Sequence, residues 1–233
     1  MTVLYLFILA HLLADFPLQT TGIYEWKYKS IWGSFFHSGV FITLSFILLF
    51  PYRVYFSFLI LFFVLWLIHG FQDWLKAVYI EKYHRDNLWI FLLDQFCHIA
   101  VIIIGVSLTP FGKHFFYLME TASFKNFLLI LIGYTFISFT GVILLAYIKK
   151  EIYATKEIYL PNEQEKWKEI FERVIYFTFF LLGGFFYIVF ILVSAVFYFG
   201  QRKQKGYLFN FVFNITFSFL VSQIFLYYLG VKL

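Results

Sequence analysis

Charged residues are scarce in this chain. They make up 13% of its 233 residues, whereas hydrophobic residues make up 62%, and the mean hydropathy is +0.82. Soluble domains have about a quarter charged residues and roughly half apolar ones. The scarcity of charge excludes an ordinary soluble fold and predicts a protein whose surface mostly contacts lipid.

Cysteine is nearly absent as well. The single thiol, Cys97, lies in an apolar segment, so an intrachain disulfide and a Cys-x-x-Cys site are both excluded. The net charge of +5 is spread over short loops between apolar segments, which is typical of membrane topology and does not indicate a nucleic-acid partner. The first apolar segment lacks a basic start and a small-residue cleavage pattern, so we expect a retained span rather than a signal peptide.

Long apolar segments recur through the whole chain and predict an all-α, polytopic transmembrane helix bundle with six to seven spans. We expect a four-helix transmembrane bundle over 1–109, and accessory transmembrane helices over 110–233 with a polar cytoplasmic loop at about 149–172. Pro17 should kink or end the first helix, and Gly183-Gly184 should bend the sixth or be a point of close helix packing. The segments run over residues 3–19, 34–50, 54–74, 88–108, 126–148, 174–199 and 207–229.

His and Asp residues are paired within these apolar segments. His11 and Asp15, His69 and Asp73, and Asp94 and His98 are each four residues apart, which places both side chains on one helix face. His37 lies early in the second segment. Ionisable residues inside membrane helices are costly and usually functional.

The pairs also agree in depth. Those of the first and third segments lie late in their spans, and the His and Asp residues of the second and fourth lie early. In an up-and-down bundle, late positions of odd spans and early positions of even spans are on the same side of the membrane. We therefore expect four consecutive helices to bring these residues to one depth. The polar stretch after the first segment, with Glu25, Lys27 and Lys29, is interpreted as a connecting loop.

The cluster has the composition of a metal site. Imidazoles and carboxylates suit one or two divalent ions, with Zn, Mn or Fe as the candidates. Such a site can hydrolyse an ester or a phosphoester, with an Asp as general base and Lys76 stabilising a developing anion. Gln19 and Gln95 are candidates for orienting ligands or substrate. The predicted metal ligands are His11, Asp15, His37, His69, Asp73, Asp94 and His98, and the predicted catalytic residues are Asp15, Asp73, Asp94 and Lys76.

These motifs resemble a known family. The opening from His11 to Gln19, His37-Ser38, His69-x-x-x-Asp73-x-x-Lys76 and Asp94-Gln95-x-x-His98 are similar to a bacterial multi-pass membrane family called domain of unknown function 3307, and Glu172-Arg173 resembles a later motif of that family. The resemblance implies a bacterial inner-membrane protein but no activity. A weaker likeness, to bacterial membrane-bound metal-dependent hydrolases, implies hydrolysis by analogy.

Three functions remain open from the sequence. The first is a metal-dependent hydrolase of a lipid or lipid-linked phosphate at the cytoplasmic leaflet, with a substrate that arrives laterally. The second is a transporter or channel for a metal ion or a proton, although the second half of the chain holds no matching ligands. The third is a structural membrane protein in which Asp73 or Asp94 forms an ion pair with Lys76. The distribution of Lys and Arg favours an external N-terminus and a cytoplasmic C-terminus, with the run Arg202, Lys203 and Lys205 as the exception.

Overall fold

The fold is helical throughout the part of the chain that the computed structural model describes, which is residues 1–50, 56–109, 121–155, 158, 160–201 and 206–230. No strand occurs in these ranges. The predicted all-α class is therefore confirmed. The chain divides into two compact units, Met1–Leu128 and Leu129–Leu233. The predicted division after residue 109 borders on residues outside the described ranges, and it stays a prediction.

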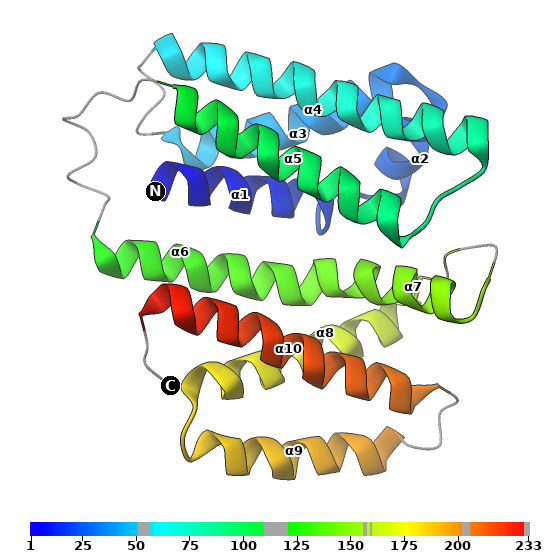
Figure 1. Cartoon of the computed structure of the whole chain (residues 1–233), viewed down its shortest axis with the longest axis vertical. Coiled ribbons are helices and arrows are strands. Elements are labelled where there is room, and N and C mark those ends of the chain that lie inside the picture. Colours follow the sequence, from blue (N-terminus) through cyan, green and yellow to red (C-terminus); the bar gives the residue numbers. More distant parts are fainter. Residues whose placement is uncertain (51–55, 110–120, 156–157, 159, 202–205, 231–233) are drawn as a thin grey trace. The chain divides into compact units, whose positions relative to one another are not determined.

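The first unit is a four-helix bundle with one short helix added to it (Figure 1). Helix α3 packs on α1 and α4, α4 packs on α5, and α5 packs on α1, so the four long helices close into a ring around a common core. The short helix α2 packs on α3 and α4. The helices are α1 (Thr2–Asp15), α2 (Thr21–Lys29), α3 (Ile31–Leu48), α4 (Phe56–Tyr83) and α5 (Leu88–Leu108).

Pro17 ends the first helix, as the sequence predicts. Helix α1 stops at Asp15, two residues before Pro17, because proline has no backbone N–H with which to continue the helical hydrogen bonds. The residues that follow correct another expectation, since they form helix α2 rather than a loop. The Thr20 side chain accepts a hydrogen bond from the Ile23 backbone N–H and thereby caps this helix, and the basic Lys27 and Lys29 lie in its last turn.

Helix α2 lies directly against the start of α3. A Cβ atom on Gly33 would overlap the backbone of Trp26 and Lys27, so only glycine allows this approach. Helix α4 is also longer than expected. It continues past Trp74 to Tyr83, which keeps Lys76 on the same helix as His69 and Asp73.

The second unit contains the remaining helices. It begins inside a rod that consists of α6 (Ala122–Thr135), the π-helical turn η2 (Phe136–Thr140) and α7 (Gly141–Ile152), and the rod is followed by α8 (Glu163–Leu182), α9 (Phe186–Gln201) and α10 (Tyr207–Leu229). The predicted polar loop at about 149–172 is partly helical, because α7 extends to Ile152 and α8 begins at Glu163. Asn162 and Glu165 form a reciprocal capping box that fixes this start.

The predicted sixth span is wrong as one continuous helix. Gly183 and Gly184 have φ angles of 62° and 54°, in the left-handed region that glycine adopts without strain, and here the chain reverses completely. Helix α9 then packs back along α8, with ring centroids 5.3 Å apart between Tyr176 and Phe190 and 6.2 Å apart between Phe171 and Phe197. The expected bend is therefore an antiparallel hairpin (Figure 1).

Among the described residues, five helices are long and apolar enough to cross a membrane, namely α3, α4, α5, α10 and the rod formed by α6, η2 and α7. Helices α1 and α9 are apolar but shorter. Large apolar side chains lie exposed on the outside of the first bundle, and Phe96 on α5 is 70% exposed. A surface of this kind suits lipid contact. The chain is thus a multi-pass helical membrane protein.

Candidate metal centre

The core of the first bundle is polar at one level, where its four long helices contribute His and Asp side chains. The four His side chains lie close together, with ring centroids 5.3 Å apart between His11 and His98, 5.5 Å between His37 and His69, and 4.1 Å between His69 and His98. None of these residues is more than 3% exposed. The structure thus brings together the residues that the sequence predicts to share one depth. We call His11, Asp15, His37, His69, Asp73, Asp94 and His98 the His/Asp cluster.

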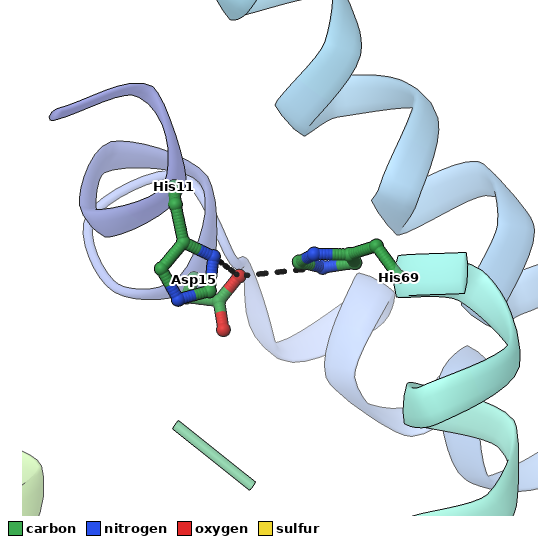
Figure 2. Close-up of side chains that lie close together, drawn as sticks. All are labelled: His11, Asp15 and His69. Atoms are coloured by element: carbon green, nitrogen blue, oxygen red, sulfur yellow. Dashed lines mark ion pairs between the residues drawn. The ribbon is translucent and has the colours of Figure 1, made fainter. Parts of the chain in front are cut away.

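Asp15 is a shared centre on the α1 side of the cluster. One of its oxygens, Oδ1, is 3.5 Å from His11 Nδ1 and 3.6 Å from His69 Nε2, and it lies between the two rings in Figure 2. The same oxygen is hydrogen-bonded to His37 Nε2 at 3.1 Å. Asp15 therefore connects side chains from three helices.

Asp73 is the carboxylate that several histidines share on the α4 side of the cluster. Its Oδ2 atom is 3.4 Å from His69 Nε2 and 3.8 Å from His37 Nε2, and its Oδ1 atom is 3.7 Å from His98 Nε2. Asp94 completes this side, because its Oδ1 atom is 3.4 Å from the same His98 nitrogen. His98 Nε2 therefore lies between two carboxylates from different helices.

Two separate ligand triads follow from this geometry. His11, Asp15 and His69 form one, and Asp73, Asp94 and His98 form the other, each with ligand atoms within 4.8 Å of one another. The triads share no residue. His37 belongs to a further group with His69 and Asp73 and lies between the two triads. Three protein ligands with an open position are the usual arrangement of a catalytic zinc ion.

The cluster also has unpaired polar atoms. In the part of the chain that the structure describes, most of the buried side-chain N and O atoms without a hydrogen-bond partner belong to it: His11 Nδ1 and Nε2, His37 Nδ1, His69 Nε2, Asp73 Oδ2, and His98 Nδ1 and Nε2. Buried polar atoms are rarely left unpaired. Most of the N···O contacts are 3.4 to 3.8 Å long, which is too long for good hydrogen bonds. Two ligands of one ion, each about 2.1 Å from it, are separated by about 3.4 Å.

Two lysines lie at the edge of the cluster. Lys76 Nζ is 2.8 Å from Asp94 Oδ2, so the ion pair considered for Asp94 is formed. Lys27 Nζ is 2.8 Å from Asp73 Oδ1 and donates a hydrogen bond to Gln19 Oε1 at 3.3 Å. Sequence reasoning missed Lys27, because its helix was interpreted as a loop. The available signal was Thr20, a capping residue in front of a segment whose last turn is basic.

The two predicted orienting glutamines differ in their contacts, since Gln95 contacts carboxylates of the cluster whereas Gln19 contacts Lys27. Gln95 Nε2 donates to Asp15 Oδ2 at 3.2 Å and lies 3.4 Å from Asp94 Oδ2, so it connects the carboxylates of the two triads. Gln19 acts through Lys27, as described above. These contacts fix side-chain directions around the cluster.

Glu172 and Arg173 belong to a separate polar network in the second unit. Arg173 is fully buried, and its guanidinium donates to the carbonyls of Ile137 and Ser138 in the π-helical turn and to Asn214 Oδ1. Glu172 accepts from Tyr207 and Asn214. The π-helical turn frees these backbone carbonyls for the arginine, which suggests that the network stabilises the unit.

The fold and the cluster define a multi-pass membrane protein with a buried His/Asp cluster inside a four-helix bundle. The chain belongs to a family described as "Protein of unknown function (DUF3307)", whose family model matches residues 3–125. The family resemblance recognised in the sequence is thereby confirmed. The matched stretch includes the whole His/Asp cluster together with Lys27 and Lys76, whereas Glu172-Arg173 lies beyond it.

The other two comparisons add no relative. No curated protein and no solved structure matches the chain. The weaker likeness to membrane-bound metal-dependent hydrolases therefore contributes an analogy to the proposal below and nothing more.

Proposed function

We propose that the His/Asp cluster binds one or two divalent metal ions, Zn, Mn or Fe, and that the protein hydrolyses a lipid or lipid-linked phosphate within the membrane. The observation that carries this proposal is the set of unpaired histidine nitrogens and the unpaired Asp73 oxygen at the centre of the bundle. A cluster that only held the helices together through ion pairs and hydrogen bonds would pair these atoms with one another. A metal ion gives each of them a partner.

The donor set fits a catalytic ion better than a purely structural one. Each triad offers three protein ligands and leaves coordination positions open. A divalent ion held in this way supplies a Lewis acid and a source of hydroxide near neutral pH. Whichever of Asp15, Asp73 and Asp94 is not fully engaged as a ligand is the candidate general base, and Lys76 is placed to stabilise negative charge beside Asp94.

The direct test of hydrolysis uses purified protein in detergent and measures phosphate release from a panel of lipid phosphates. Activity should appear when Zn, Mn or Fe is returned to chelator-treated protein. His98→Ala should lower it at least about 100-fold, because it removes a ligand between two carboxylates. The matched control is His84→Ala, a change in an exposed residue outside the cluster. Metal-dependent flux into liposomes, without phosphate release from any substrate, would instead support a transporter.

The α8–α9 hairpin also changes the expected topology. It brings the chain back to the side from which α8 started, so α9 ends on the same side as the C-terminal end of α7, whose last turn contains Lys149 (Figure 1). The run Arg202, Lys203 and Lys205 lies outside the described residues and follows α9 in the sequence. The basic run then no longer conflicts with the other basic connections. We infer six complete crossings plus the hairpin, with the cluster near the cytoplasmic leaflet and both termini outside. The external C-terminus replaces the cytoplasmic one expected from the sequence.

Reporter fusions test this topology in bacterial cells. Alkaline phosphatase at the C-terminus should be active and green fluorescent protein there should be dark, because the former needs an external location and the latter a cytoplasmic one. Fusions after Thr155, between α7 and α8, should give the opposite pattern and serve as the control. A fluorescent C-terminal fusion would contradict both the inferred number of crossings and the hairpin.

A further inference from the structure

In the part of the chain that the structure describes, lysine side chains form ion pairs with the carboxylates of only one of the two triads. Lys27 and Lys76 each form a 2.8 Å ion pair with a carboxylate of the triad Asp73, Asp94 and His98. In the other triad, and within the described ranges of the chain, Asp15 contacts histidines and the neutral amide of Gln95 but no lysine. The negative charges of Asp73 and Asp94 are therefore balanced by the ammonium groups of the two lysines. The negative charge of Asp15 in the other triad has no lysine that balances it.

The lysines lie between the buried centre and the outside. The side chains of Lys27 and Lys76 are 11% and 19% exposed, whereas those of Asp73 and His98 are at most 1% exposed. Helix α2, which carries Lys27, has no buried residue, and its Tyr24 and Trp26 are 41% and 42% exposed. Exposed aromatic residues beside lysines are typical of the interface between lipid headgroups and water. The ammonium groups thus lie between the cluster and the level of the headgroups.

The charge balance indicates which group the two lysines would bind after a metal ion has taken over their carboxylates. When a divalent ion binds to the second triad, its two positive charges balance Asp73 and Asp94, and the ammonium groups of Lys27 and Lys76 lose their partners. Two released ammonium groups match the two negative charges of a phosphate monoester. A phosphodiester carries only one negative charge and matches them less well.

We propose that Lys27 and Lys76 form a binding site for the phosphate group of a lipid phosphate monoester, and that this site becomes available when a metal ion takes over Asp73 and Asp94. The lysines are then neutralising groups in the metal-free protein and substrate-binding groups in the metal-loaded protein. Metal and phosphate would consequently strengthen each other's binding. This inference rests on the proposed metal centre and adds the substrate class and the role of helix α2.

The test measures zinc binding and phosphate binding separately, by calorimetry on protein in phosphatidylcholine nanodiscs. Zinc-loaded wild-type protein should bind inorganic phosphate, and chelator-treated protein should not. Lys27→Met and Lys76→Met should each weaken phosphate binding at least about 10-fold while zinc still binds, because each change removes one charge-assisted contact. Lys27→Arg should retain most of the phosphate affinity.

Lys29→Met is the matched control, since Lys29 lies on the same helix but is exposed and paired with Glu25. It should bind zinc and phosphate like wild type. A second arm uses nanodiscs that contain phosphatidic acid or, at the same fraction, phosphatidylglycerol. Competition with inorganic phosphate by the monoester lipid alone identifies a headgroup as the source, whereas competition by neither lipid contradicts the lipid assignment.

The outcomes separate the two proposals. If zinc binds and the Lys27→Met variant binds phosphate as tightly as wild type, the lysine site is wrong and the metal centre stands. If the wild-type protein binds no metal, the metal centre fails, and with it the release of the lysines. Zinc binding in Lys27→Met also shows that the variant has folded, so a loss of phosphate binding there is specific.

Discussion

Metal-free Asp73→Ala protein is expected to lose most of the thermal stability that added zinc, manganese or iron gives to the wild-type protein. Asp73 contacts His37, His69, His98 and Lys27, which come from four different helices. A ligand present at about 100 times its Kd stabilises the folded state by about 2.7 kcal/mol. For wild-type protein this corresponds to an increase in Tm of roughly 5 to 10 °C. The variant lacks a ligand of one triad and should lose most of this increase.

The same substitution should weaken the metal-free protein. It leaves the Lys27 ammonium without its carboxylate in a largely buried position, and breaking a buried pair in this way costs about 3 to 5 kcal/mol. Thermal unfolding followed by tryptophan fluorescence measures both effects. Glu25→Gln is the control, because this carboxylate is exposed and should change stability by only a few tenths of a kcal/mol. A full zinc response in Asp73→Ala, and also in the isosteric Asp73→Asn, would contradict the assignment of Asp73 as a ligand.

Arg173→Met is expected to destabilise the second unit by about 3 to 5 kcal/mol, because it removes a fully buried charge whose partners stay behind. The guanidinium lies at hydrogen-bond distance from Ile137 O, Ser138 O and Asn214 Oδ1, and Glu169 is 3.7 Å away. Without it, two carbonyls of the π-helical turn lose their donor. Arg173→Lys should recover only part of the loss, since one ammonium group cannot reproduce the planar fork.

In thermal unfolding measured in detergent, the Arg173→Met variant should show a transition at a lower temperature than the wild-type protein. Metal binding should persist in this variant, because all the proposed ligands lie in the first unit. Lys166→Met on the same helix is the control, since its ion pair with Glu163 is exposed and worth little. An Arg173→Met variant as stable as wild type would show that the buried network does not stabilise this unit.

Much of the first unit could be predicted because membrane helices follow simple rules. Apolar length predicted α3, α4 and α5, Pro17 predicted the end of α1, and the i,i+4 pairs predicted which helix faces carry the cluster. The common depth of His11, His37, His69 and His98 followed from alternating helix directions alone. These inferences depend on local sequence and on chain direction, and both can be read without a structure.

The remaining features depend on contacts between distant parts of the chain. The ion pair of Lys27 with Asp73 needs helix α2 to fold back onto α3 and α4, which an isolated polar segment does not reveal. The reversal at Gly183-Gly184 depends on two left-handed residues in succession, whereas glycine pairs inside apolar segments also occur in straight helices. The contacts of Arg173 could not be inferred from the sequence, because its partners come from η2 and α10.

The measurement that tests the central claim most directly is the metal content of the wild-type protein, determined by mass spectrometry after purification in detergent without chelators. The metal centre predicts one or two equivalents of Zn, Mn or Fe per chain, with the equivalent held by Asp73, Asp94 and His98 lost in both Asp73→Ala and His98→Ala and retained in His84→Ala. A wild-type protein that carries no metal and takes up none when the ions are supplied would contradict it. The His/Asp cluster would then be a set of ion pairs that hold the helices together, or a path for protons.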